Sequence, residues 1–280
     1  MRYCPNCGKA GVEGMRFCPE CGQSLIAVGP EEQRYVPKPE ATRRDVAMDV
    51  GYAKPRRFDP INRRTQLLLC LLVILIVLDV AAVFSDLAQA ELINRAIMGQ
   101  AVTEAEAAAN DNRQAAIGAG QTALYIAYLV VFLMWIYRAN KNLRSLRAAG
   151  LSFTPGWAVG WFFVPVMNLF RPYQVVSEIW KASDPKVDMT DDTSWKAVAT
   201  APIVGCWWAL FLISTFVANI ALRLAFGGME LTDLLYSTYA YTVSDGIDIV
   251  YLVTTIFMVW WIGQFQEEKS KLTSSAYQPI

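Results

Sequence analysis

The amino-acid sequence predicts an all-α integral membrane protein with four transmembrane helices, a further interfacial or re-entrant helical segment, and a small N-terminal Cys4 zinc ribbon. Three observations lead to this fold class. The 280-residue chain is 54% hydrophobic and 18% charged, which is more apolar than the usual soluble domain. Its apolar residues gather in uncharged stretches close to the ~20 residues that a helix needs to cross a bilayer. Four of its six cysteines stand within the first 21 residues.

The composition also limits the function. The 25 Lys and Arg residues balance the 25 Asp and Glu residues, so no net positive charge favours binding to nucleic acid, and we expect no such partner. The sequence contains no histidine, which excludes Ser-His-Asp triads, Cys-His dyads and HExxH zinc sites. Because the sequence also has no phosphate-binding loop and no second metal cluster, we expect no enzyme activity.

Residues 1–25 form the predicted zinc ribbon. Two C-x2-C pairs, separated by ten residues, supply four thiolates: Cys4, Cys7, Cys18 and Cys21. This spacing is typical of a closed tetrahedral site, so we expect one structural Zn2+ per chain. A rubredoxin-like iron site and a pair of disulfides are the alternatives, but such iron sites belong to larger domains and cytoplasmic thiols stay reduced. The pattern resembles the short zinc-ribbon modules at the ends of many bacterial membrane proteins.

A proline-rich and charged stretch, residues 26–60, has the composition of a flexible cytoplasmic linker. The membrane domain covers residues 61–268, with predicted spans at 67–84, 118–137, 197–222 and 249–266, and residues 269–280 form a C-terminal tail. A fifth uncharged stretch, 151–170, contains Pro155 and Pro165, and lipid does not replace the backbone donors that proline lacks. We therefore expect residues 151–181 to form an interfacial or re-entrant segment, with a fifth span as the alternative.

The distribution of basic residues predicts the orientation, because positively charged flanks of spans stay in the cytoplasm. With four spans, the cytoplasmic flanks hold fifteen Lys and Arg residues, and the opposite side holds three, namely Arg95, Arg113 and Arg223. With five spans, the two counts become ten and eight. The four-span arrangement predicts a multi-pass protein of the cell membrane with both termini in the cytoplasm.

Local patterns predict where two helices begin and end. Thr103 and Glu106 fit a capping box that opens a helix running into the second span. We expect this helix to continue as far as Gly150, a residue suited to the left-handed C-terminal cap. From Pro172 the sequence turns helical again. Its apolar face holds Val175, Val176, Ile179 and Trp180, and its polar face holds Gln174, Glu178 and Lys181.

Five polar residues belong to the outer half of the predicted membrane domain or to its outer edge: Asp79, Asn219, Arg223, Asp245 and Asp248. A buried carboxylate is costly unless it is paired. We expect Asp79, Arg223 and Asp248 to form a charge cluster that ties three spans together. A proton or ion pathway, or side chains that reach out to the membrane surface, are the alternatives.

The chain resembles a bacterial membrane family, the domain of unknown function 4328. The residues that carry the resemblance are Trp135, Arg138, Asn142, the run PGWAVGWFFVP from Pro155 to Pro165, Asn168, Pro172, Gln174, Glu178, Trp180, Ala182, Ser183 and Asp184. The resemblance extends over roughly residues 60–268. It implies a four-span fold, for which an N-terminal zinc ribbon is a familiar partner, and it implies no activity.

These observations predict a membrane protein of uncharacterised activity that acts as a scaffold or sensor. We expect its partners to be the lipid bilayer and a protein bound by the cytoplasmic zinc ribbon. The alternative is a small transporter or channel that uses the Pro/Trp-rich segment and the outer charged residues. Inverted repeats or a continuous polar pathway would favour transport, and the sequence displays neither.

Overall fold

The computed structural model describes residues 58–187, 191–227 and 230–275, together with the backbone of three short strands near the N-terminus. The chain divides into two units, Met1–Lys54 and Pro55–Ile280. In the first unit, β1 (Arg2–Tyr3) pairs antiparallel with β2 (Ala10–Gly11) and with β3 (Ile26–Ala27), in the order β2-β1-β3. The four predicted zinc ligands, Cys4, Cys7, Cys18 and Cys21, lie outside the described residues.

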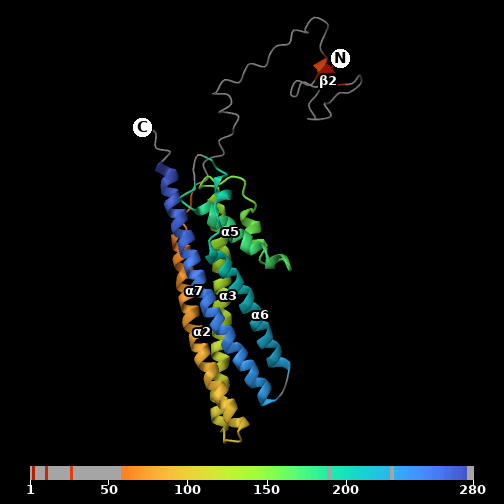
Figure 1. Cartoon of the computed structure of the whole chain (residues 1–280), viewed down its shortest axis with the longest axis vertical. Helices are drawn as coiled ribbons and strands as arrows, with labels where there is room; N and C mark the ends of the chain where they lie inside the picture. Colours follow the sequence, from red (N-terminus) through yellow and green to blue (C-terminus); the bar gives the residue numbers. More distant parts are fainter. Residues whose placement is uncertain are drawn as a thin grey trace. The chain divides into compact units, whose positions relative to one another are not determined.

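The second unit is built on four long helices (Figure 1). These are α2 (Asn62–Ile97), α3 (Glu104–Leu143), α6 (Pro202–Gly227) and α7 (Leu231–Ser275). All four are long and apolar enough to cross a membrane, so the predicted all-α membrane fold with four spanning helices is confirmed. With 26 to 45 residues each, they exceed the ~20 residues that a span needs. Residues 198–201 of the predicted third span precede α6, because the helix begins only at Pro202.

The Pro/Trp-rich segment does not form a spanning helix. It contains α4 (Pro155–Gly160), the single-turn helix η1 (Met167–Leu169) and α5 (Arg171–Ser183), followed by η2 (Ser194–Ala197). Thr154 caps α4 by accepting a hydrogen bond from the Trp157 backbone N–H. The prolines at 155 and 165 therefore break residues 151–170 into pieces too short to cross a bilayer.

The helices pack in a fixed order. Helix α7 lies against α2 and α6, and α2 also lies against α3, while α5 contacts α3, α6 and α7. We call the end of the bundle that holds α4, α5 and η2 the linker end, because α2 begins there. The opposite end, where α2 and α6 end and α3 and α7 begin, is the hairpin end (Figure 1).

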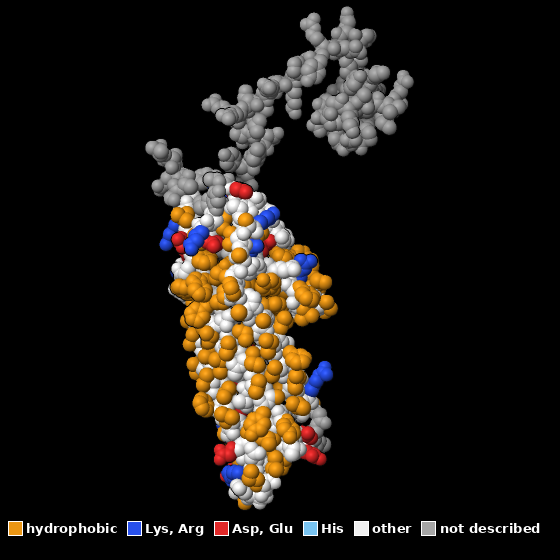
Figure 2. Space-filling view, viewed as in Figure 1, with side chains coloured by type: hydrophobic (Ala, Val, Ile, Leu, Met, Phe, Trp, Pro, Cys, Tyr) orange, Lys and Arg blue, Asp and Glu red, His pale blue; other side chains and the backbone are white. Residues whose placement is uncertain are grey.

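An apolar band covers the middle of the bundle, and charged side chains gather toward its two ends (Figure 2). The band contains many large exposed side chains, including Val77 at 65% and Phe216 at 68% exposure. Such a continuous apolar surface would be unusual on a soluble monomer. It is the surface that contact with a lipid bilayer requires.

Aromatic side chains fill the linker half of the bundle. Trp135 and Trp207 are 0% and 1% exposed, and the Phe132 ring centroid lies 6.3 Å from that of Trp135 and 6.0 Å from that of Trp207. The indole Nε1 of Trp135 donates a hydrogen bond of 3.0 Å to Thr65 Oγ1. Buried aromatic side chains therefore fill the core where α5 contacts the long helices.

Two predictions about helix ends have different outcomes. The capping box is confirmed, since Thr103 Oγ1 accepts from the Glu106 backbone N–H, and the Glu106 side chain accepts from the Thr103 backbone N–H. The continuation of this helix to Gly150 is wrong, because α3 ends at Leu143. The chain turns away when Arg147 takes a left-handed conformation with φ 65°, and Gly150 with φ 63° serves the loop and not the helix cap.

Candidate functional site

A polar cavity of about 730 Å3 lies between the four long helices in their hairpin half. Helix α7 supplies half of the polar residues that line it, including Asp245 and Asp248, and α2 supplies Asp86. The other polar lining residues are Gln89, Gln114, Gln121, Thr122, Tyr125, Ser237, Thr238, Tyr241 and Ser244. Neither Lys nor Arg is among the described residues that line it.

The most deeply buried carboxylate belongs to Asp79, which is 0% exposed and lies behind this lining. Its Oδ1 accepts a hydrogen bond of 3.0 Å from Gln121 Nε2, and its Oδ2 accepts one of 2.9 Å from the Tyr125 hydroxyl. Gln121 Nε2 also donates to Asp245 Oδ1 at 3.4 Å. One neutral amide therefore bridges two carboxylates from α2 and α7.

Two more carboxylates complete the group. Asp248 accepts a hydrogen bond from the Ser214 hydroxyl of α6. Asp86 is 8% exposed, and its Oδ1 accepts from Gln114 Nε2 at 3.1 Å. Its other oxygen, Oδ2, is buried without a hydrogen-bond partner. All four carboxylates are held by neutral donors, and the ion pairs between described residues involve none of them.

The predicted charge cluster of Asp79, Arg223 and Asp248 is wrong. Arg223 is exposed on α6, as is Asn219, whose amide donates to the Thr215 carbonyl of its own helix. Successive residues of a helix are 100° apart, so Arg223 lies about 200° around the helix from Ala221, which is fully buried. The cation therefore faces away from the cavity, although Asp79, Asp245 and Asp248 do come together.

Sequence analysis also missed several residues of this site, among them Asp86, Gln114, Gln121 and Tyr125. A signal was available. Asp79 and Asp86 are seven residues apart on α2, and Gln114 and Gln121 are seven apart on α3. Two helical turns bring residues at this spacing back to one face.

The cavity is closed toward the linker end. Below Asp79 and Asp248, the hydroxyls of Tyr128 and Tyr251 are joined by a buried hydrogen bond of 2.7 Å. The Phe132 ring follows, 5.7 Å from the Tyr128 ring. Further toward the linker end, the buried side chains of Trp135 and Trp207 fill the core. The polar lining therefore does not continue through the described part of the bundle.

Polar residues at the linker end have a different arrangement. Glu178 is 5% exposed, contrary to its predicted place on a polar face, and it accepts hydrogen bonds from the backbone N–H groups of Ser152 and Phe153. Gln266 donates to the Ala139 carbonyl and Ser183 and accepts from Asn142. Residues that carry the family resemblance thus join α3, α5 and α7.

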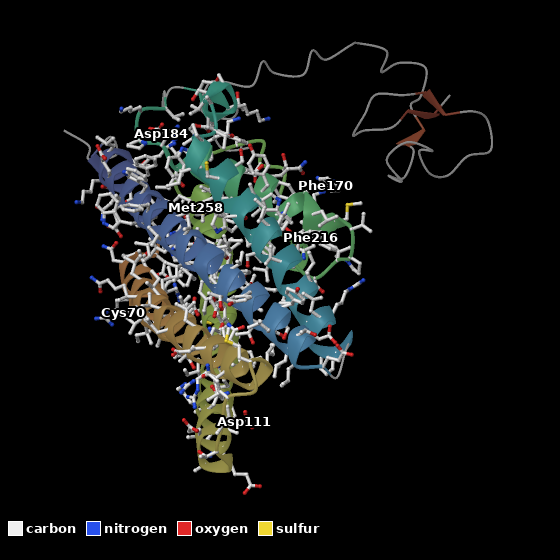
Figure 3. All side chains as sticks on the ribbon, turned by 60° about the horizontal axis from the view of Figure 1, so that its bottom comes forward. Cys70, Asp111, Phe170, Asp184, Phe216 and Met258 are labelled. Atoms are coloured by element: carbon white, nitrogen blue, oxygen red, sulfur yellow. The ribbon has the colours of Figure 1, made fainter. Side chains whose placement is uncertain are left out.

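The described residues hold no group of three or more His, Cys, Asp or Glu side chains placed to bind a metal ion. The carboxylates of the cavity are among these residues, whereas the four N-terminal cysteines lie outside the described part of the chain. Figure 3 labels two carboxylates outside the cavity, Asp111 toward the hairpin end and Asp184 toward the linker end.

Comparison with known families gives two matches. A family described as a domain of unknown function (DUF4328) matches residues 98–264, which is more than half of the chain. A family described as a zinc-ribbon domain matches residues 3–25. Neither a curated protein nor a solved structure matches the chain. The resemblance read from the sequence is confirmed, and the matched region includes the cavity walls from α3, α6 and α7.

Proposed function

The chain belongs to the membrane family described as domain of unknown function 4328, and we propose that it is a membrane-embedded sensor of a cationic organic ligand. The ligand binds in the polar cavity at the hairpin end, and the zinc ribbon, which precedes α2 in the chain, binds a protein in response. The protein has no catalytic role in this proposal.

The observation that carries the proposal is a group of buried carboxylates without a positive partner among the described residues. Asp79, Asp86, Asp245 and Asp248 lie in or beside one cavity, and one oxygen of Asp86 lacks any hydrogen bond. A buried charge that is not paired is strongly unfavourable, more so inside a membrane. A bound ammonium or guanidinium group would remove this cost, which makes the cavity selective for a cation.

The size and wall of the cavity support an organic cation over a bare metal ion. A volume of about 730 Å3 falls within the ~300–1,000 Å3 range of small-molecule sites. The carboxylates of the described residues are not grouped as metal ligands. Tyr125 and Tyr241 add aromatic rings to the wall, and such rings attract ammonium and guanidinium groups.

The closed layer below the cavity favours sensing over transport. A transporter or channel would need a polar route past the Tyr128–Tyr251 hydrogen bond and the Phe132 ring. Helix α7, in contrast, runs without a break from the cavity to the linker end, with Asp245 in the cavity and Gln266 in the linker-end network. A ligand that moves Asp245 therefore acts on a helix that also contacts α5.

In this proposal, both termini lie in the cytoplasm and the protein is a multi-pass protein of the cell membrane. The basic residues of the linker end support this orientation, since positive flanks stay in the cytoplasm. The ribbon would hold one structural Zn2+ through Cys4, Cys7, Cys18 and Cys21, because its donor set of four thiols fits a closed zinc site. Elemental analysis of the purified chain should give one zinc per chain, and Cys4→Ser or Cys21→Ser should lower it while the helical content is kept.

Equilibrium binding tests the ligand. The full chain in nanodiscs of uncharged lipid is titrated with spermidine, tetraethylammonium and Mg2+ by calorimetry. We expect one of the two organic cations to bind more tightly than Mg2+, and Asp245→Asn to weaken that binding by at least about tenfold. The matched control, Asp111→Asn, changes an exposed carboxylate of the same end and should leave binding unchanged. Equal losses in both variants, or tighter binding of Mg2+, would contradict the proposal.

The response at the linker end needs a second readout. Protein that co-purifies with the chain should depend on residues 1–25, and its amount should change when the organic cation that binds is added. If the same cation instead crosses the membrane of sealed vesicles that contain the protein, and Asp79→Asn stops that flux, the sensor proposal gives way to transport.

A further inference from the structure

At the linker end, an apolar groove and a basic pocket meet at one residue. The groove, about 580 Å3, runs between α2, α3 and α4 and is lined by Val130, Leu133, Met134, Tyr137, Val159 and Phe163, with Arg64 and Arg138 at its edge. The pocket, about 800 Å3, is lined by Phe58, Asp59, Pro60, Arg138, Lys141, Asn142 and Ser145. Arg138 lines both spaces.

The two spaces follow one another along α3. Val130 and Met134 precede Arg138 and Lys141 by one to three turns on the same helix, toward the middle of the apolar band. From the middle of the membrane outward, a molecule beside α3 meets apolar side chains first and cations after them. This is the order of parts in a phospholipid, whose acyl chain lies in the bilayer core and whose head group lies at its surface.

The surroundings of Arg138 favour binding of an anion. Its side chain is 16% exposed and pairs with Asp59, which also lies 3.9 Å from Arg64. One nitrogen of its guanidinium group, Nε, is buried without a hydrogen-bond partner. Lys141, one turn further, has its Nζ 6.0 Å from the centroid of the Tyr137 ring. Arg138 and Arg64 thus share the single carboxylate of Asp59, and a phosphate would supply further acceptors for Arg138 and Lys141.

We propose that this composite site binds one anionic phospholipid, with its phosphate at Arg138 and Lys141 and an acyl chain in the groove against Val130, Met134 and Phe163. The site does not depend on the cation cavity, which lies in the other half of the bundle. Asp59 belongs to the stretch that leads from the linker into α2. A phosphate that competes with Asp59 for Arg138 would therefore also change how this stretch is held.

Native mass spectrometry of the full chain in detergent tests the proposal, with phosphatidylglycerol as the anionic lipid, phosphatidylcholine as the uncharged one, and inorganic phosphate as the free anion. We expect one phosphatidylglycerol to bind at least about fivefold more tightly than phosphatidylcholine, since each Lys or Arg near the surface favours an anionic lipid by about that factor. Inorganic phosphate should bind far more weakly because it has no acyl chain.

Two variants separate the two parts of the site, and a third serves as the control. Arg138→Gln should lower phosphatidylglycerol binding about fivefold and reduce the preference over phosphatidylcholine. Met134→Trp fills the groove without changing charge, and should weaken both lipids. Arg63→Gln is the matched control, because Arg63 is exposed on α2 and lines neither space, and should leave binding unchanged. Lys141→Gln gives the same readout as Arg138→Gln if the latter does not fold.

Four results would overturn the proposal. Equal binding of the two lipids would remove the role of the cations. Equal losses in Arg138→Gln and Arg63→Gln would reduce the effect to general surface charge. An unchanged affinity in Met134→Trp, or phosphate binding as tight as that of phosphatidylglycerol, would mean that the groove takes no acyl chain.

Discussion

In the linker half of the bundle, buried polar side chains bind the backbone and one another across neighbouring helices, whereas in the hairpin half they surround a cavity. Glu178 and Gln266 each accept or donate hydrogen bonds that join separate segments. The carboxylates of the hairpin half instead accept hydrogen bonds from neutral side chains around the cavity. These carboxylates belong to Asp79, Asp86, Asp245 and Asp248. Similar polar residues in one membrane bundle thus serve two purposes, and their hydrogen-bond partners distinguish the two.

The comparison predicts that stability depends mostly on the linker half. The largest effect is expected for Trp135→Ala, which removes a fully buried indole and its hydrogen bond to Thr65. Such truncations cost ~3–5 kcal/mol of unfolding free energy. Reversible unfolding in mixed micelles measures this cost. Ile117→Ala, at the cavity wall, is the corresponding change in the hairpin half and should cost clearly less. Equal costs would contradict the claim that stability depends mostly on the linker half.

A smaller loss is expected from Glu178→Ala. The change leaves the backbone N–H groups of Ser152 and Phe153 without their acceptor, and an orphaned buried donor costs ~1–3 kcal/mol. Glu178→Gln keeps one acceptor oxygen and should cost less. Gln174→Ala, on the exposed face of the same helix, is the control and should be nearly neutral. The same unfolding assay ranks the three variants, and a Glu178→Ala protein as stable as the control would contradict the structural role.

At the hairpin end, stability is expected to come from local capping and not from buried polar groups. Thr103→Ala removes the hydroxyl that accepts from the Glu106 backbone N–H, and loss of such a cap costs ~1 kcal/mol. Thr103→Ser keeps the hydroxyl and should restore the stability. Hydrogen exchange at the first turn of α3 gives a local readout. No change in exchange on Thr103→Ala would mean that the capping box does not hold this end.

Particular residues explain how much of this the sequence could predict. The four spanning helices follow from uncharged runs, and the capping box follows from Thr103 and Glu106 alone, because both depend on local chemistry. The side of α6 that Arg223 faces was not predictable in this way. That helix is apolar nearly all round, so its sequence carries little information on which face is buried.

The same limit applies to the cavity and to the family motif. Helical spacing predicts a polar face for Glu178, but the loop at Ser152 and Phe153 supplies donors that only the folded chain brings near. Gln121 donates hydrogen bonds to both Asp79 and Asp245. Gln121 and Asp245 lie 42 and 166 positions away from Asp79 in the sequence. Contacts at such separations depend on the packing order of the helices, which the hydrophobic pattern does not specify.

The thermal stability of a variant with Asp245→Asn and Asp248→Asn tests the central claim that the cavity carboxylates serve binding and not folding. Both changes remove charge and keep shape, so without ligand the double variant should unfold at the same temperature as the natural chain or at a higher one. The organic cation that binds should stabilise the natural chain by ~2.7 kcal/mol at a hundredfold excess over its dissociation constant, and should leave the double variant unchanged. A double variant that unfolds at a clearly lower temperature without ligand would contradict the account, because the carboxylates would then be part of the fold.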